Sequence, residues 1–141
     1  MMQDNTNSQF NVFSDNYNKG FYEFANNISA NYFKSTSVDR KILIGHADDN
    51  IVLKQKFEEL SRLIDGQEHM ERKDFYSLVK LTGKILVDCA YDIMHAKKPE
   101  VKKSGLNIIN GFFDVARKTK DNDLLETAQV IKRNADGSAA K

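Results

Sequence analysis

The sequence predicts an all-α protein built around an antiparallel helical hairpin. Its 141 residues include one proline and seven glycines, too few for a turn-rich β protein. Apolar residues recur three and four positions apart along most of the chain, as they do on one face of a helix. The two longest segments of this kind are joined by a short link containing the proline, which predicts that they pack as antiparallel neighbours.

The composition indicates one soluble globular domain, with 40% hydrophobic and 29% charged residues. Cys89 is the single cysteine, and its apolar surroundings favour a small core residue over a reactive thiol. The N-terminal sequence lacks the basic and apolar regions of a signal peptide, and no apolar run approaches the ~18 residues of a membrane span. We therefore expect no membrane partner and a cytoplasmic location, which is the host cytoplasm if the protein is viral.

Residues 1–48 are predicted to form an N-terminal helical arm and connector, rich in aromatic residues and asparagine. One helical stripe contains Phe10, Phe13, Tyr17, Phe21, Phe24 and Ile28. Asparagine and Gly20 are poor helix formers, so this helix needs a surface to pack on, either the rest of the chain or a neighbouring subunit. Residues 34–48 are expected to be a connector with a short helical turn from Val38 to Ile44.

Residues 49–133 are predicted to form the helical core, and residues 134–141 a disordered tail. The first core helix is expected from about Asn50 to Asp65. Its apolar face comprises Ile51, Phe57, Leu60 and Ile64.

The hairpin is predicted at about residues 68–119. Its first helix runs from about Glu68 to Ala96, and its second from Pro99 to Thr119, because proline suits the first turn of a helix. A last helix is expected from about Asn122 to Arg133.

Both hairpin helices have apolar faces wider than one partner helix would cover. One face closes the hairpin, and the other must pack on the rest of the chain or on another copy. We therefore expect a homo-oligomer, with cover by the N-terminal helices as the alternative. The positions expected in the hairpin core or subunit interface are Ile85, Cys89, Ile108 and Phe112.

Basic residues concentrate in the C-terminal third, although the formal net charge of the chain is only +1. Residues 97–133 hold nine basic and five acidic side chains. The candidates for contact with DNA phosphates are Lys97, Lys98, Lys102, Lys103, Arg117, Lys118 and Lys120. A solvated helix face accounts for the same residues equally well.

Arg40 and His46 have the six-residue spacing found in helical ribonucleases of the HEPN type. In such a pair the arginine can hold phosphate while the histidine moves a proton. The pattern is short, and here it falls in the expected connector beside Gly45. A HEPN-like ribonuclease therefore remains an alternative function.

Metal and cofactor sites are not expected. Asp88, Asp92 and His95 share one helix face, but no second Glu-x-x-His unit completes a di-metal site, so a solvated polar face is favoured. The chain has no glycine-rich phosphate loop. Gly105 and Gly111 lie within a predicted helix, where small residues permit close approach of a neighbouring helix.

Residues 74–118 resemble the central hairpin of small terminase subunits from T4-type tailed phages. The resemblance rests on the tyrosine-bearing stretch 75–79, on Gly83, on Pro99 at the tip and on the stretch 114–117, which reads Asp-Val-Ala-Arg. Gly83 precedes Pro99 by 16 residues, and Pro99 precedes the aspartate by 15. The family tip often reads His-Pro-Arg, whereas this chain has Lys-Pro-Glu, which reverses the charge after the proline.

This resemblance implies a non-enzymatic homo-oligomer, in the form of a ring. Such subunits recognise double-stranded phage DNA when packaging starts, and they stimulate the ATPase of the large terminase subunit. The resemblance therefore implies three partners: other copies of the chain, double-stranded DNA and a large terminase subunit. The competing class is a helical adaptor or inhibitor that binds a single protein partner.

Overall fold

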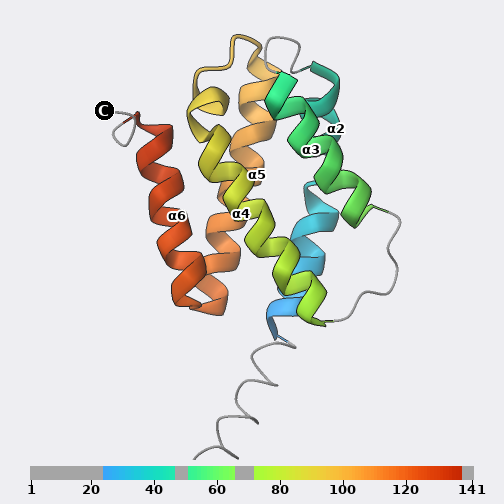
Figure 1. The fold of residues 1–141 in the computed structure, drawn as a ribbon, viewed down its shortest axis with the longest axis vertical. Coiled ribbons are helices and arrows are strands. Elements are labelled where there is room, and N and C mark those ends of the chain that lie inside the picture. Colours follow the sequence, from blue (N-terminus) through green and yellow to red (C-terminus); the bar gives the residue numbers. More distant parts are fainter. Residues whose placement is uncertain (1–23, 47–50, 66–71, 138–141) are drawn as a thin grey trace, which may run out of the picture.

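The computed structural model describes residues 24–46, 51–65 and 72–137, and this part of the chain is helical without strands (Figure 1). The predicted all-α fold class is therefore confirmed for these residues. A helical segment over residues 24–35 comes first. The elements that follow are α2 (Ser37–His46), α3 (Ile51–Ile64), α4 (Arg72–Met94), α5 (Pro99–Thr119) and α6 (Asn122–Ala135).

Helices α4 and α5 form the middle of the bundle. Helix α4 packs most extensively on α6, and α5 packs most extensively on α2. The two central helices also contact each other, and α3 packs on α2 and, over a smaller area, on α4. Helix α6 therefore flanks the central pair on one side, and α2 and α3 flank it on the other (Figure 1).

Both ends of α5 and the start of α6 agree with the predicted boundaries. Pro99 lies at the start of α5, and Lys98 before it is extended. Lys120 ends α5 in a left-handed conformation with φ 56°, and its N–H donates to the carbonyl of Ala116. Asp121 then caps α6, because its side chain accepts hydrogen bonds from the backbone at Asp123 and Leu124.

Residues 34–46 are helical rather than a connector with one short turn. Backbone hydrogen bonds continue across Thr36, whose N–H donates to Tyr32 O at 3.0 Å and whose carbonyl accepts from Arg40 N at 2.9 Å. Burial of Arg40 and Leu43 explains why this segment is helical despite its weak pattern. Of the expected aromatic stripe, Phe10, Phe13, Tyr17 and Phe21 lie outside the described residues.

Two further expectations need correction. Ile51 is 67% exposed, and the buried face of α3 uses Leu53 instead, at 2% exposure. Residues 134 and 135, expected in a disordered tail, belong to α6. The side chain of Asn134 donates to Val87 O at 2.8 Å, which fastens this last turn to α4.

The apolar faces of α4 and α5 are covered by the chain itself. The four positions proposed for the hairpin core or subunit interface are all buried: Ile85, Cys89, Ile108 and Phe112. Tyr32, Phe33 and Leu43 join the same core from the N-terminal helices. Residues 24–46 therefore share one core with the later helices, and a subunit interface would need other, exposed residues.

Candidate functional site

A cluster of lysines surrounds the beginning of α5. Lys97, Lys102 and Lys103 are exposed, and Lys98 is half-buried. Within the described part of the chain, the side chains of the exposed Lys97, Lys102 and Lys103 have no ion-pair partner. These ammonium groups are therefore available to an anion from solution.

The position of this cluster is electrostatically unfavourable for the isolated chain. The N-terminal end of a helix carries a partial positive charge, which disfavours nearby cations. Glu100 is the one acidic residue in the first turn of α5, and Lys98 at the N-cap makes no side-chain capping bond. A phosphate group bound here would interact favourably with both the lysines and the helix terminus.

The seven basic residues proposed for DNA contact form two separate groups. Arg117, Lys118 and Lys120 lie at the opposite end of α5, which is 21 residues long. At ~1.5 Å per residue, roughly 30 Å of helix separates the two ends. Arg117 is also hydrogen-bonded to Asp114, so it is less available to phosphate than the lysines before it.

Helix α6 adds two basic residues that were not among the predicted DNA contacts. Lys132 and Arg133 lie in its last turn. The bond from Asn134 to Val87 places this turn against the C-terminal half of α4, and Figure 1 shows that α6 ends where α4 ends and α5 begins. We call this end of the bundle the basic end, and it comprises Lys97, Lys98, Lys102, Lys103, Lys132 and Arg133.

An aromatic pair also lies at the basic end. The rings of Tyr91 and His95 are stacked, with centroids 4.0 Å apart and planes 20° apart. His95 Nδ1 lies 2.9 Å from Tyr91 O, which holds the imidazole in this position. Tyr91 is 47% exposed. Their spacing of four residues within one predicted helix was the sequence signal that could have identified them.

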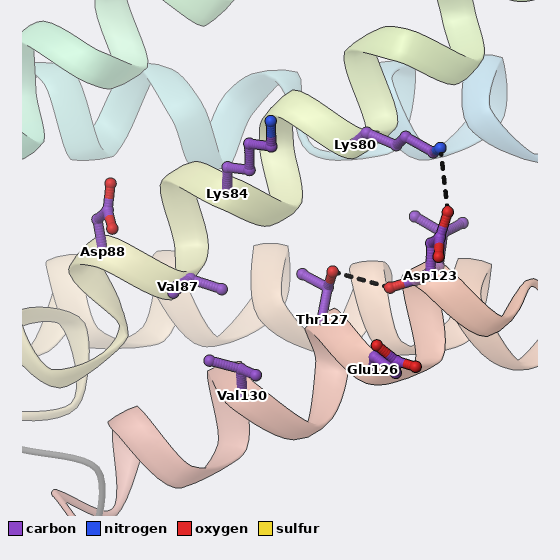
Figure 2. A pocket seen from close by; sticks show the side chains of 9 residues that line it. Lys80, Lys84, Val87, Asp88, Asp123, Glu126, Thr127 and Val130 are labelled. Carbon is purple, nitrogen blue, oxygen red and sulfur yellow. Dashed lines mark hydrogen bonds and ion pairs between the residues drawn. The ribbon is translucent and has the colours of Figure 1, made fainter.

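A shallow groove of about 630 Å³ runs between α4 and α6 (Figure 2). Lys80 and Lys84 line its α4 side, while Asp123 and Glu126 line its α6 side. Lys80 Nζ lies 3.4 Å from Asp123 Oδ2, so the two walls partly neutralise each other (Figure 2). The lining of this groove therefore carries charges of both signs.

The ribonuclease pair is not assembled into a site. Arg40 is 1% exposed. Its guanidinium donates to Phe33 O at 2.8 Å and Thr36 Oγ1 at 2.9 Å, and it pairs with Asp65 at 2.5 Å. His46 is exposed at the end of α2. The arginine is therefore engaged within the fold and is not available to hold phosphate.

The described residues contain no group of three or more side chains suited to a metal ion. Asp88 Oδ2 lies 3.7 Å from Lys56 Nζ, and the His95 ring is stacked on Tyr91.

The thiol of Cys89 is not reactive at neutral pH. Burial, with smaller contributions from Asp92 and Asp88, raises its pKa to about 12, so it stays protonated.

Among the described helices, none combines the length and apolar character needed to cross a membrane. A helical bundle of this kind serves many unrelated functions, so the fold alone assigns none. Comparison with protein-family models, with curated proteins and with solved structures found no match.

Proposed function

We propose that this protein is a non-enzymatic DNA-packaging protein that binds double-stranded DNA through its basic end. The observation that carries this proposal is the group of exposed lysines, Lys97, Lys102 and Lys103, without ion-pair partners in the described residues. Lysines contact phosphate without reading bases, so we expect strong dependence on salt and little dependence on DNA sequence.

The resemblance of residues 74–118 to small terminase subunits supports the same function. With it we propose that α4 and α5 act as an antiparallel hairpin, that copies of the chain form a ring, and that the ring regulates a large terminase subunit. In a ring the basic end would be repeated around the axis, so weak phosphate contacts would add up. The subunits would meet through exposed residues, because Ile85, Cys89, Ile108 and Phe112 are buried.

A salt titration of DNA binding tests this proposal. Wild-type protein and a Lys97→Ala/Lys98→Ala/Lys102→Ala/Lys103→Ala variant would be titrated with one duplex over a range of salt concentrations. The plot of log K against log salt has a negative slope, and each lost phosphate contact reduces its magnitude by about 0.9. We therefore expect a markedly shallower slope in the variant. A Lys118→Ala/Lys120→Ala variant removes charge from the far end of α5 and should change the slope less.

Two outcomes would contradict the proposal. If the wild type does not bind DNA at low salt, or if the four-lysine variant keeps the wild-type slope, the lysines do not form a DNA site. The groove between α4 and α6 then favours the second candidate, an adaptor that binds one protein partner. RNA cleavage that is lost in a His46→Ala variant would instead indicate the ribonuclease alternative.

A further inference from the structure

We infer that the Tyr91–His95 pair is a stacking platform for an unpaired nucleobase, so that the basic end also binds single-stranded DNA. The inference rests on the proposed DNA-binding function and names a second form of its substrate. A single strand would be available at the end of a duplex or where the duplex is locally opened.

The rings of Tyr91 and His95 already stack on each other, so a nucleobase would add a third ring to an existing stack. The two rings are nearly parallel, at 20°, and their centroids are 4.0 Å apart. The contact between His95 Nδ1 and Tyr91 O fixes the imidazole, so little rotational freedom remains to be lost when a base binds. Gly137 lies against the tyrosine ring, and His95 is exposed. A base would therefore extend the stack on the imidazole face directed away from Tyr91.

The surrounding charges provide the backbone contacts that such a base needs. Lys97 and Lys98 lie two and three positions after His95 along the chain, and Lys132 and Arg133 lie at the same end of the bundle. Proteins that bind single strands combine aromatic rings with cationic side chains along the phosphate backbone. The basic end combines cations with an exposed aromatic pair. Near the far end of α5, Tyr32 lines a pocket together with Lys118, but Tyr32 and its ring partner Phe33 are both buried.

The test compares one short single strand with the duplex of the same sequence, by fluorescence anisotropy at fixed salt. His95→Leu removes the aromatic face but keeps an apolar side chain, and His95→Phe keeps an aromatic face without the imidazole nitrogens. Base stacking on an aromatic ring makes affinity about tenfold stronger. We expect His95→Leu to bind the single strand about tenfold more weakly, with duplex binding unchanged and with His95→Phe close to the wild type.

A ligand-side control separates the base from the phosphates. An oligonucleotide with one abasic position keeps every phosphate, and a series that moves this position along the strand locates the stacked base. We expect one abasic position to weaken wild-type binding about tenfold and to have no effect on His95→Leu. Thermal unfolding of each variant, which changes an exposed side chain, verifies that the fold is retained.

The possible failures are distinguishable. If His95→Leu binds the single strand as tightly as wild type, or if His95→Phe is as weak as His95→Leu, stacking is excluded and duplex binding still supports the proposed function. An equal loss on the single strand and the duplex also excludes a base-specific role. If the wild type binds neither form of DNA, both the inference and the proposed function are wrong.

Discussion

Arg40 is the one charged residue that is buried in the described part of the chain. It is almost completely buried, and its guanidinium joins the carbonyl of Phe33 to Ser61 and Asp65 at the end of α3. A charged group in this position is stable only because its donors are satisfied. Arg40 therefore links α2 to the C-terminal end of α3 through its contacts with Ser61 and Asp65.

Substitution Arg40→Ala should be strongly destabilising. It leaves a cavity, an unpaired Phe33 carbonyl and an Asp65 without its partner. Removing one member of a buried pair costs about 3–5 kcal/mol, and we expect about 3 kcal/mol because the Asp65 side chain is 40% exposed. Urea unfolding measures this loss. Asp65→Asn is the matched control and should cost less, since the buried arginine keeps its other acceptors. An Arg40→Ala variant as stable as the wild type would mean that the network contributes nothing.

A second prediction for a single residue concerns the pH dependence of stability that Cys89 causes. Its pKa, raised mainly by burial to about 12, exceeds the ordinary value of 9.0, so the protonated thiol is favoured in the folded state. The stability contributed by the protonated Cys89 thiol is fully present below pH 9 and is lost as the pH rises towards 12. Unfolding free energies of the wild type should fall more steeply over this range than those of Cys89→Ala, by about 1.4 kcal/mol per pH unit at most. Rapid reaction of the native thiol with a disulfide reagent at neutral pH would contradict this account.

Among the helical elements, α5 approaches its neighbours through glycines. A Cβ at Gly105 would collide with Ile93 Cγ2 on α4, and a Cβ at Gly111 would meet the ring of Tyr32 at 2.6 Å. Tyr32 lies close enough for its hydroxyl to donate to Ile108 O at 2.8 Å. The prediction that these two glycines permit close helix approach is therefore confirmed.

Substitution Gly105→Ala should destabilise the protein although alanine is the better helix former. Overpacking costs about 1–3 kcal/mol, and the collision with Ile93 favours the upper part of this range, which exceeds the gain of about 1 kcal/mol in helix propensity. Gly45→Ala is the matched control, because nothing lies within 4 Å of a Cβ there, and it should be neutral or stabilising. In an Ile93→Ala background, Gly105→Ala should cost less, because the colliding methyl group is gone. Additive effects of the two substitutions, measured by urea unfolding, would show that they do not interact.

The sequence predicted those elements whose boundaries are set by local chemistry. Pro99 defines the start of α5, and Asp121 separates it from α6. It predicted only a short helical turn from Val38 to Ile44 where residues 34–46 are helical, because the stability of this segment comes from burial of Arg40 and Leu43 against other helices. The lysines of α5 could be identified from composition. The Tyr91–His95 pair could be identified from its four-residue spacing, but its position near Lys132 and Arg133 could not, because only the packing of α6 on α4 brings these residues to one end of the bundle.

At the scale of the whole molecule, the core is completed within one chain. The N-terminal helices cover α5, and α6 covers α4, so both wide apolar faces are buried without a second copy. The surface then differs between the ends of α5. Lysines surround its N-terminal end, where the helix charge repels them, and basic residues at its C-terminal end are favourably placed. One end therefore bears an electrostatic cost that DNA binding would relieve.

This cost can be measured without any DNA. In a Lys97→Gln/Lys102→Gln/Lys103→Gln variant, we expect stability at low ionic strength to rise by about 1 kcal/mol, because each cation near a helix N-terminus costs a few tenths of a kcal/mol. Lys118→Gln is the control of opposite sign: its cation lies near the C-terminal end of α5, so its removal should lower stability slightly. At about 1 M salt, where the Debye length is about 3 Å, both differences should vanish. Urea unfolding at the two salt concentrations decides the matter: if the triple variant is no more stable than the wild type at low salt, the lysines do not strain the free protein, and relief of repulsion contributes nothing to anion binding.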